Sequence, residues 1–360
     1  YSSAASDVYK RQGIQIVMSG LTLAIYWIGA VLINDAGMVD KVQIFSDMMV
    51  FSQYAIQVVM SFMMLVMIFI ILPRAIVSAR RINEVLSTNP KILNGTVTET
   101  AESDKGTIEF KNVSFKYPDA SDYVLRDNSF KAEKGKTIAF IGATGSGKST
   151  LINLIPRFYD ATDGNVLVDG VNVKEYDIES LNNKLGYVPQ KAVMFSGTVS
   201  SNVAYGNNGR DNYSADDIKQ AIKIAQGTEF VEKMENQYEG AIAQGGSNIS
   251  GGQKQRLAIA RAVCRKPEIY IFDDSFSALD YKTDRVLRSE LKKETAGTTT
   301  LIVAQRIGTI KDADCIIVLD KGNMVGKGTH SELMKNCEVY QQIALSQLSK
   351  EELGLSLIHI

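Results

Sequence analysis

The sequence has little histidine, little cysteine and almost no net charge. Its 360 residues include two histidines and three cysteines. The 39 Lys and Arg residues are nearly balanced by 40 Asp and Glu residues, which gives a formal charge of −1. The spacing of Cys264, Cys315 and Cys337 is typical neither of a metal site nor of a disulfide framework, which favours a reducing compartment for that part of the chain. No basic excess or stripe indicates a nucleic-acid partner.

Charge is absent altogether from two long apolar stretches, 13–34 and 48–72. Each is long enough to cross a bilayer, because a spanning helix needs about 20 apolar residues. Lysine or arginine precedes the first stretch and follows the second, which favours a cytoplasmic side for both outer ends. We therefore expect two spans of a cell-membrane protein, joined by the turn 34–47, with the rest of the chain in the cytoplasm.

Two other interpretations of these stretches explain fewer features. A pair of buried core helices leaves the glutamines of the region, among them Gln53 and Gln57, without an obvious role, whereas a membrane bundle can place them on a wet interior or another helix. A cleaved signal peptide accounts for one apolar run and needs a cleavage site that we do not find.

Changes in composition predict where the domains begin and end. A helical pattern continues to about Leu86, and Asn89-Pro90 ends it. The terminal segments have no interpretable pattern and fit non-native tails. The expected division is an unassigned tail at 1–12, a partial membrane domain at 13–88, a polar linker at 89–106, a second domain at 107–348 and an unassigned tail at 349–360.

The second domain alternates segments with strand and helix patterns. Apolar residues alternate from Ile108 to Phe115 with one slip, and Asp169-Gly170 lies between Val-Leu-Val and Val-Asn-Val, as in a β-hairpin. Other expected elements are strands at 137–141, 185–188, 268–272 and 299–304, helices at 213–234 and a hairpin at 315–328. This order predicts an α/β core with an added antiparallel part and a helical insert.

A phosphate-binding loop is the strongest motif. Gly-Ala-Thr-Gly-Ser-Gly-Lys-Ser-Thr has the form G-x-x-x-x-G-K-[ST] between an expected strand and an expected helix. The backbone N–H groups of such a loop surround phosphates, the lysine reaches the β- and γ-phosphates, and the following hydroxyl binds Mg²⁺. The predicted nucleotide-binding residues are Gly142, Ala143, Thr144, Gly145, Ser146, Gly147, Lys148, Ser149 and Thr150.

Two further motifs follow at compatible distances. The strand ending at Asp273-Asp274 offers a carboxylate for Mg²⁺ (Asp273) and, next to it, a base or water-orienting group (Asp274). In Asn248-Ile-Ser-Gly-Gly-Gln, Ser250 can cap a helix whose N-terminus forms a second anion site. A solvated acidic turn and an ordinary Ser-Gly-Gly turn are the alternatives.

Together these motifs resemble the ATP-binding cassette (ABC) family, in particular exporters with fused membrane and nucleotide-binding domains. The resemblance covers about 13–348: Walker A is the phosphate loop, the signature is Ile249 to Gln253, Walker B is Ile269 to Asp273, and the D-loop is Ser277 to Asp280. It implies a membrane α-helical segment with two of six spans, and an α/β P-loop nucleotide-binding domain with antiparallel β and helical subdomains.

The resemblance also implies roles for individual residues. ATP and Mg²⁺ are the expected cofactors, Tyr117 stacks on adenine, and Gln190 of the Q-loop binds Mg²⁺ and water. The family pairs two cassettes head to tail, so the signature binds the ATP of a partner cassette. The residues implied for that contact are Ser250, Gly251, Gly252 and Gln253. The D-loop match adds Asp280 as a further site residue.

The chain departs from the family pattern at catalytic positions. Asp274 stands where Glu is usual, Gln305 where a switch histidine is usual, and Ala243 where Glu is usual before the signature. Aspartate is shorter than glutamate, and a misplacement of about 1 Å can cost about 100-fold in rate. Glutamine cannot take a proton as imidazole can. The expected catalytic residues Asp274, Gln305 and Gln190 thus predict slow hydrolysis, and a fully competent variant site is the alternative.

The expected function is that of an ATP-binding and ATPase subunit, present here as a C-terminal fragment, of an exporter of an unidentified hydrophobic or amphipathic substrate. A nearly intact signature beside a weakened site resembles one half of a heterodimer, so a different half-transporter is the expected partner. The alternative is an ATP-gated channel or regulatory membrane subunit. The spans argue against soluble cassette ATPases of DNA repair or translation, and the signature and D-loop against P-loop kinases.

Overall fold

The computed structural model describes residues 2–206 and 213–347, with the backbone alone at 2–11 and at residue 281. Tyr1 and the expected tail at 349–360 lie outside the described residues. The chain forms two compact units, Tyr1–Lys91 and Ile92–Ile360.

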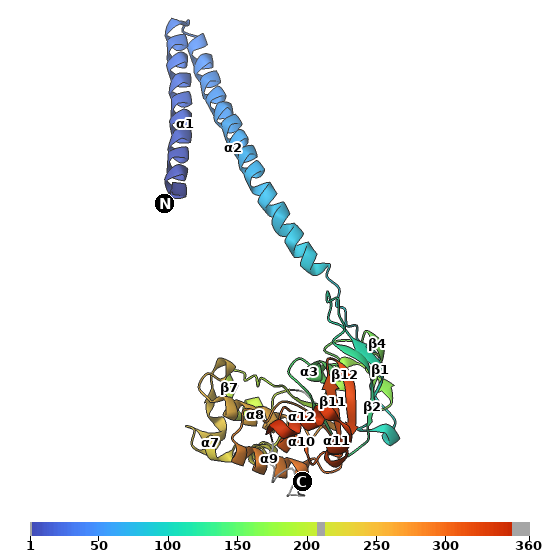
Figure 1. The fold of residues 1–360 in the computed structure, drawn as a ribbon. Coiled ribbons are helices and arrows are strands. Elements are labelled where there is room, and N and C mark those ends of the chain that lie inside the picture. Colours follow the sequence, from blue (N-terminus) through green and yellow to red (C-terminus); the bar gives the residue numbers. More distant parts are fainter. Residues whose placement is uncertain (1, 207–212, 348–360) are drawn as a thin grey trace. The chain divides into compact units, whose positions relative to one another are not determined.

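The first unit is a hairpin of two long helices, α1 (Ser2–Asp35) and α2 (Asp40–Leu86), drawn in blue in Figure 1. Both are long and apolar enough to cross a membrane. Two expectations need correction. The turn at 34–47 is wrong, because α2 already begins at Asp40. Residues 2–12, expected to belong to an unassigned tail, form the first turns of α1. Backbone helical hydrogen bonding extends through charged and polar residues, and Gln43 donates to Asp47 within α2 at 3.0 Å.

The two helices touch at small residues near the turn. A Cβ on Gly29 would come within 2.1 Å of the Met48 sulfur, so a larger residue here would force the Met48 side chain to move. Ile25 and Ser52 are buried at the same contact. The large apolar side chains of α2 are otherwise mostly exposed, from Val50 to Leu72 and beyond. Such a surface needs apolar surroundings.

The described residues of the second unit form three sheets. A six-stranded sheet has the order β12-β11-β3-β10-β9-β6, parallel except for β12, and a four-stranded antiparallel sheet has the order β2-β1-β4-β5. The strands are β1 (Ile108–Phe115), β2 (Leu125–Ala132), β3 (Thr137–Ile141), β4 (Asp163–Val168), β5 (Val171–Asn172), β6 (Leu185–Val188), β7 (Gly197–Thr198), β8 (Ala241–Ile242), β9 (Ile269–Asp273), β10 (Thr299–Val303), β11 (Cys315–Asp320) and β12 (Asn323–Gly328). The third sheet pairs β7 with β8.

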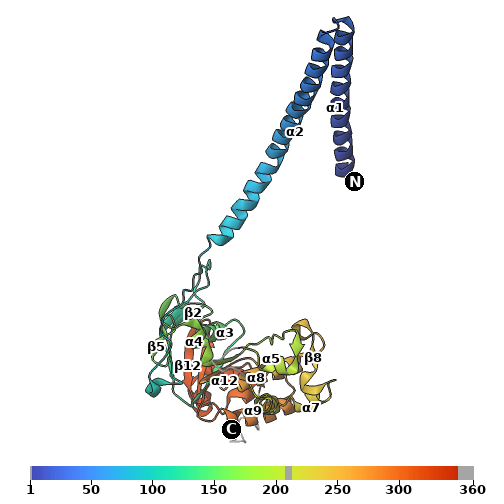
Figure 2. The same cartoon turned by 180° about the vertical axis from the view of Figure 1, so that it is seen from behind.

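The helices of this unit surround the parallel strands. They are α3 (Lys148–Asn153), α4 (Ile178–Asn183), α5 (Val199–Val203), α6 (Ala215–Ile224), α7 (Thr228–Glu232), α8 (Gly251–Cys264), α9 (Tyr281–Glu294), α10 (Ile307–Ile310), α11 (His330–Asn336) and α12 (Glu338–Gln347), with 3₁₀ turns at Glu102–Asp104, Gln237–Glu239 and Gln244–Gly246. Within this unit, Figures 1 and 2 place α7 at the opposite end from β2, with α8 between them.

The six-stranded sheet separates two sets of core residues. Phe140, Ile271 and Leu301 pack on the side of the four-stranded sheet and α3. Their neighbours along the strands, such as Ala139 and Phe272, pack on the helical side. This alternation is what a strand with both faces covered requires, and it confirms the α/β core with an antiparallel part and a helical insert.

Local signals in the sequence correspond to local features of the strands. The slip in β1 is a register shift between Phe110 and Val113. Asp169 and Gly170 have φ of 50° and 77°, which is the left-handed geometry of a tight hairpin turn. Lys321 and Gly322 form the second hairpin turn in the same way.

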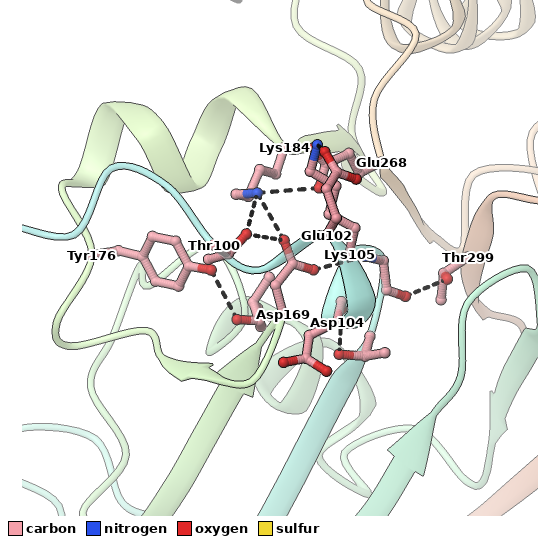
Figure 3. Close-up of polar contacts among 12 residues, drawn as sticks. Thr100, Glu102, Asp104, Lys105, Asp169, Tyr176, Lys184, Glu268 and Thr299 are labelled. Carbon is pink, nitrogen blue, oxygen red and sulfur yellow. Dashed lines mark hydrogen bonds and ion pairs between the residues drawn. The ribbon is translucent and has the colours of Figure 1, made fainter.

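The second half of the expected linker is part of the folded second unit. Val97 pairs with Tyr176, and Gly95 donates to the Tyr176 carbonyl at 2.9 Å. Figure 3 shows the polar cluster that follows, in which the buried Lys184 ammonium donates to Asp169 (2.7 Å), Thr100 (3.1 Å) and Glu268 (3.2 Å). Polar residues of this segment such as Asn94 and Thr100 therefore bind distant parts of the domain, and the segment is not a solvated linker over its whole length.

Candidate nucleotide-binding site

The loop 142–150 connects β3 to α3 at the end of the parallel sheet. Two of its glycines are required by space: a Cβ on Gly142 would lie 2.0 Å from the Leu319 carbonyl oxygen, and one on Gly147 would lie 2.8 Å from Leu125 Cδ2. Gly147 also has a φ of 97°, which glycine adopts most readily. The helix begins at Lys148, so its first N–H groups face the loop.

The Lys148 ammonium lies over its own loop. It donates to the carbonyls of Gly142 (2.9 Å) and Ala143 (2.8 Å) and to the Ser146 hydroxyl (3.3 Å). Burial lowers the pKa of Lys148, and the nearby carboxylates of Asp274 and Asp273 oppose that change. The Lys148 ammonium thus binds neutral oxygen atoms of the loop, and an anion such as a phosphate can replace them as its partner.

The Ser149 hydroxyl and the Asp273 carboxylate form a pair of oxygen ligands. Ser149 donates to Asp273 Oδ1 at 2.8 Å, and burial raises the pKa of Asp273 while this hydrogen bond opposes the rise. Among the described residues no group of three or more His, Cys, Asp and Glu side chains could hold a metal by itself. This small hard-oxygen set fits Mg²⁺, which usually binds one or two protein oxygens together with phosphates and water.

The three predicted catalytic residues meet at one oxygen atom. Gln305 donates to Asp274 Oδ2 at 2.7 Å, and Gln190 donates to the same oxygen at 3.2 Å. Asp274 has a φ of 46°, an uncommon backbone conformation for a non-glycine residue that is often found at functional sites. Its N–H donates to Val303 at 2.9 Å, which ties it to β10, the strand before Gln305.

Burial is the main influence on the acidity of this carboxylate. It raises the pKa of Asp274, while hydrogen bonds from Gln190, Ser277 and Gln305 oppose the rise. The two amides neither gain nor lose a proton at accessible pH. The network can therefore hold Asp274 in place, and its only titrating member is Asp274 itself.

Tyr117 lies beside the end of the phosphate loop. Its hydroxyl and that of Thr150 are 3.0 Å apart. The ring makes edge contacts with Phe115 and Tyr159, with ring centres 4.9 and 5.2 Å apart, and it is half-buried. An aromatic ring next to the loop is available to a flat ligand.

The predicted signature lies at the start of α8, and Ser250 is the N-cap of this helix, as the sequence suggested. Ser250 and Gln253 form a reciprocal capping box, with the Ser250 N–H donating to Gln253 Oε1 at 2.8 Å. A Cβ on Gly252 would lie 3.3 Å from the Ala278 carbonyl, so the signature and the D-loop are neighbours. In the D-loop, Asp280 accepts from the Thr283 N–H at 3.0 Å and caps α9.

Two residues missed by sequence reasoning connect these parts. Buried Gln255 in α8 donates to the Pro189 carbonyl at 3.2 Å, next to Gln190. Gln347 in α12 binds the backbone of 305–307. In the described part of the chain, no hydrogen bond joins the signature residues 250–253 to the loop 142–150.

The sequence matches the family described as ABC transporter over residues 125–277. It is 40% identical to an uncharacterized ABC transporter ATP-binding protein of Mycobacterium bovis over 366 residues, which cover 98% of this chain and 60% of that protein. It is 38% identical to the ATP-dependent lipid A-core flippase of Haemophilus influenzae, over 77% of this chain and 46% of that protein.

A solved structure, described as a bacterial Atm1-family ABC exporter with ATP bound, is similar in fold. Its TM-score is 0.79 at 28% sequence identity, and the match covers 97% of this chain and 59% of that one. The chain therefore spans less than two thirds of the length of these proteins.

Proposed function

Since the chain belongs to the ABC transporter family, we propose that it is the ATP-binding part of an exporter subunit that binds ATP tightly and hydrolyses it slowly. The observation that carries this proposal is the division of the site. Lys148 and the Ser149–Asp273 pair are the groups that hold a nucleotide, and they are present here. Asp274, in contrast, is bound by two side-chain amides that do not titrate.

In the proposed ATP complex, the Lys148 ammonium leaves its loop carbonyls for the phosphates, and the loop N–H groups surround them. Ser149, Asp273 and Gln190 hold Mg²⁺, which supplies neutralisation of phosphate charge when bound. Tyr117 stacks on the adenine ring. Lys148, Ser149, Asp273 and Tyr117 lie at or beside the loop, and Gln190 contacts Asp274, the neighbour of Asp273.

Slow hydrolysis follows from the groups that surround Asp274. The carboxylate must orient or deprotonate water, and the two glutamines that hold it in place cannot accept the proton that it takes up. A histidine in place of Gln305 would add a group that titrates near neutral pH. The bound nucleotide at this site is therefore expected to remain ATP for long periods.

The rest of the proposal concerns the longer protein. The signature residues Ser250 to Gln253 complete the ATP site of a different half-transporter, which supplies the glutamate and histidine that are replaced here. The membrane helices belong to a transport domain in the cell membrane, with the second unit in the cytoplasm. A hydrophobic or amphipathic substrate is proposed because the second span is rich in methionine, a residue that adapts to varied apolar shapes.

ATP binding and hydrolysis should be measured in membranes or detergent on the full-length protein, alone and with its partner. The proposal expects tight Mg²⁺-dependent ATP binding by the protein alone, little turnover, and faster turnover with the partner. Brisk turnover by the protein alone that disappears in Asp274→Asn would contradict it.

A further inference from the structure

The side chain of Gln347, in the last turn of α12, bridges two backbone groups on either side of Arg306. Its Nε2 donates to the Gln305 carbonyl at 2.8 Å, and its Oε1 accepts from the Ile307 N–H at 2.9 Å. The orientation of this amide follows from its partners, because a carbonyl can only accept and an N–H can only donate.

The Ile307 N–H needs a partner from elsewhere in the chain. It is the first N–H of α10, and the residue that precedes this helix, Arg306, provides no side-chain cap. The first N–H groups of a helix have no acceptor within the helix. Gln347 supplies the missing acceptor from a position 40 residues later.

The same segment is held on its other side by α9. Arg288 donates to the Gly308 carbonyl at 3.1 Å and is itself fixed by two hydrogen bonds of 3.0 Å to Asp284. The backbone from Gln305 to Gly308 is thus fastened at both ends. Of these two contacts, only the one from Gln347 is made to Gln305, the residue whose side chain reaches Asp274.

We propose that Gln347 is a positioning residue that holds the Gln305 side chain on Asp274 and so couples α12 to the hydrolytic part of the site. The inference rests on the proposed function. The Gln305–Asp274 hydrogen bond of 2.7 Å weakens steeply if the Gln305 backbone moves, since such bonds are confined to about 2.7–3.2 Å. Gln347 fixes that backbone through the carbonyl of Gln305 itself.

The test compares Gln347→Ala with Gln342→Ala in the full-length protein. Gln342 is exposed on the same helix, and among the residues that the structure describes its side chain bonds only to Glu338 on that helix. Gln347→Ala should speed hydrogen exchange at the Ile307 amide about fivefold, the factor that matches the roughly 1 kcal/mol of one lost hydrogen bond. It should lower kcat for ATP several-fold with KM nearly unchanged, while Gln342→Ala alters neither quantity.

A second variant separates the two bonds. Gln347→Glu retains an acceptor for the Ile307 N–H but loses the donor to the Gln305 carbonyl. It should therefore keep slow exchange at Ile307 and still lower kcat. If Gln347→Glu instead exchanged at Ile307 as fast as Gln347→Ala and kept an unaltered kcat, the assignment of the two atoms would be contradicted.

A Gln305→Ala background shows whether Gln347 acts through Gln305. There, Gln347→Ala should still speed exchange at Ile307 but leave kcat unchanged. An equal fall of kcat in both backgrounds would overturn the proposed coupling. Normal ATP binding with unchanged kcat in Gln347→Ala would overturn this role alone, whereas absence of ATP binding in the unaltered protein would overturn the proposed function as well.

Discussion

Asp273 and Asp274 are neighbours at the end of β9, yet they belong to two different parts of the site. Asp273 accepts from Ser149, beside Lys148 and the loop, and we refer to these three residues as the binding part. Asp274 accepts from Gln190 and Gln305. Asp274 and Gln305 form the hydrolytic part, and Gln190, a proposed Mg²⁺ ligand, contributes to both parts. Burial raises the pKa of both carboxylates, but their partners differ. On the proposed function, this contrast predicts that ATP binding and ATP hydrolysis depend on largely separate groups, so that substitutions can change one without the other.

The largest effect should come from removing the binding cation. Lys148→Ala should weaken ATP binding by more than about 100-fold, because a charge-assisted hydrogen bond is worth about 1.5–3 kcal/mol and Lys148 contributes more than one. Equilibrium binding of a fluorescent ATP analogue measures this. Lys335→Ala, at an exposed lysine of α11, is the control. Unaltered affinity in Lys148→Ala would remove Lys148 from the binding part.

The next largest effect should come from restoring the hydrolytic part. Asp274→Glu combined with Gln305→His should raise single-turnover hydrolysis by about 10- to 100-fold, since a well-placed general base contributes about 10²–10⁴-fold. ATP affinity should change less than threefold, because the binding part is untouched. Each single substitution should give a smaller gain. An equal gain in affinity and rate would show that the two parts are not separable.

A smaller effect is expected at the edge of the binding part. Tyr117→Ala should weaken ATP binding about tenfold, because aromatic stacking is worth about 0.5–1.5 kcal/mol beyond its buried area. Tyr117→Phe keeps the ring and loses only the hydroxyl contact with Thr150, so it should retain most of the affinity. Equal losses in both variants would assign the effect to the hydroxyl and not to stacking.

The smallest effect near neutral pH should be a difference in pH dependence. The pKa of Asp274 is raised by burial, so hydrolysis should fall as pH decreases through that raised value and the carboxylate gains a proton. The pKa of Lys148 is lowered by burial, so ATP binding should weaken as pH increases through that lowered value and the ammonium is lost. Rate and affinity profiles on one preparation would measure both. Parallel profiles would contradict the division.

The sequence predicted those features that depend on neighbouring residues. The loop 142–150, the Asp169-Gly170 turn and the Ser250 cap each require particular residue types at short spacing. The end of α2 at Leu86 also agrees with the expectation from Asn89-Pro90. The strand end at Asp273-Asp274 indicated Asp274, and the resemblance assigned Gln190 and Gln305, but neither predicted that these residues meet at a single oxygen.

Features that depend on distant partners were not predictable in this way. The polar composition of 89–106 suggested a solvated linker, whereas Thr100 binds Lys184 and Asp169, far along the chain. Gln347 lies 42 residues from Gln305, and no local pattern marks a glutamine that caps another helix. The turn at 34–47 was inferred from the polar composition of that stretch, but a helix can begin among polar and charged residues, as α2 does at Asp40.

The most direct test of the central claim is the chemical state of the nucleotide that stays bound. Full-length protein would be incubated for minutes with Mg²⁺ and ATP, freed from unbound nucleotide, denatured and assayed for ATP and ADP. The account predicts that most of the nucleotide released is ATP, and that Asp274→Glu with Gln305→His shifts it to ADP. Mostly ADP from the unaltered protein would contradict slow hydrolysis at this site.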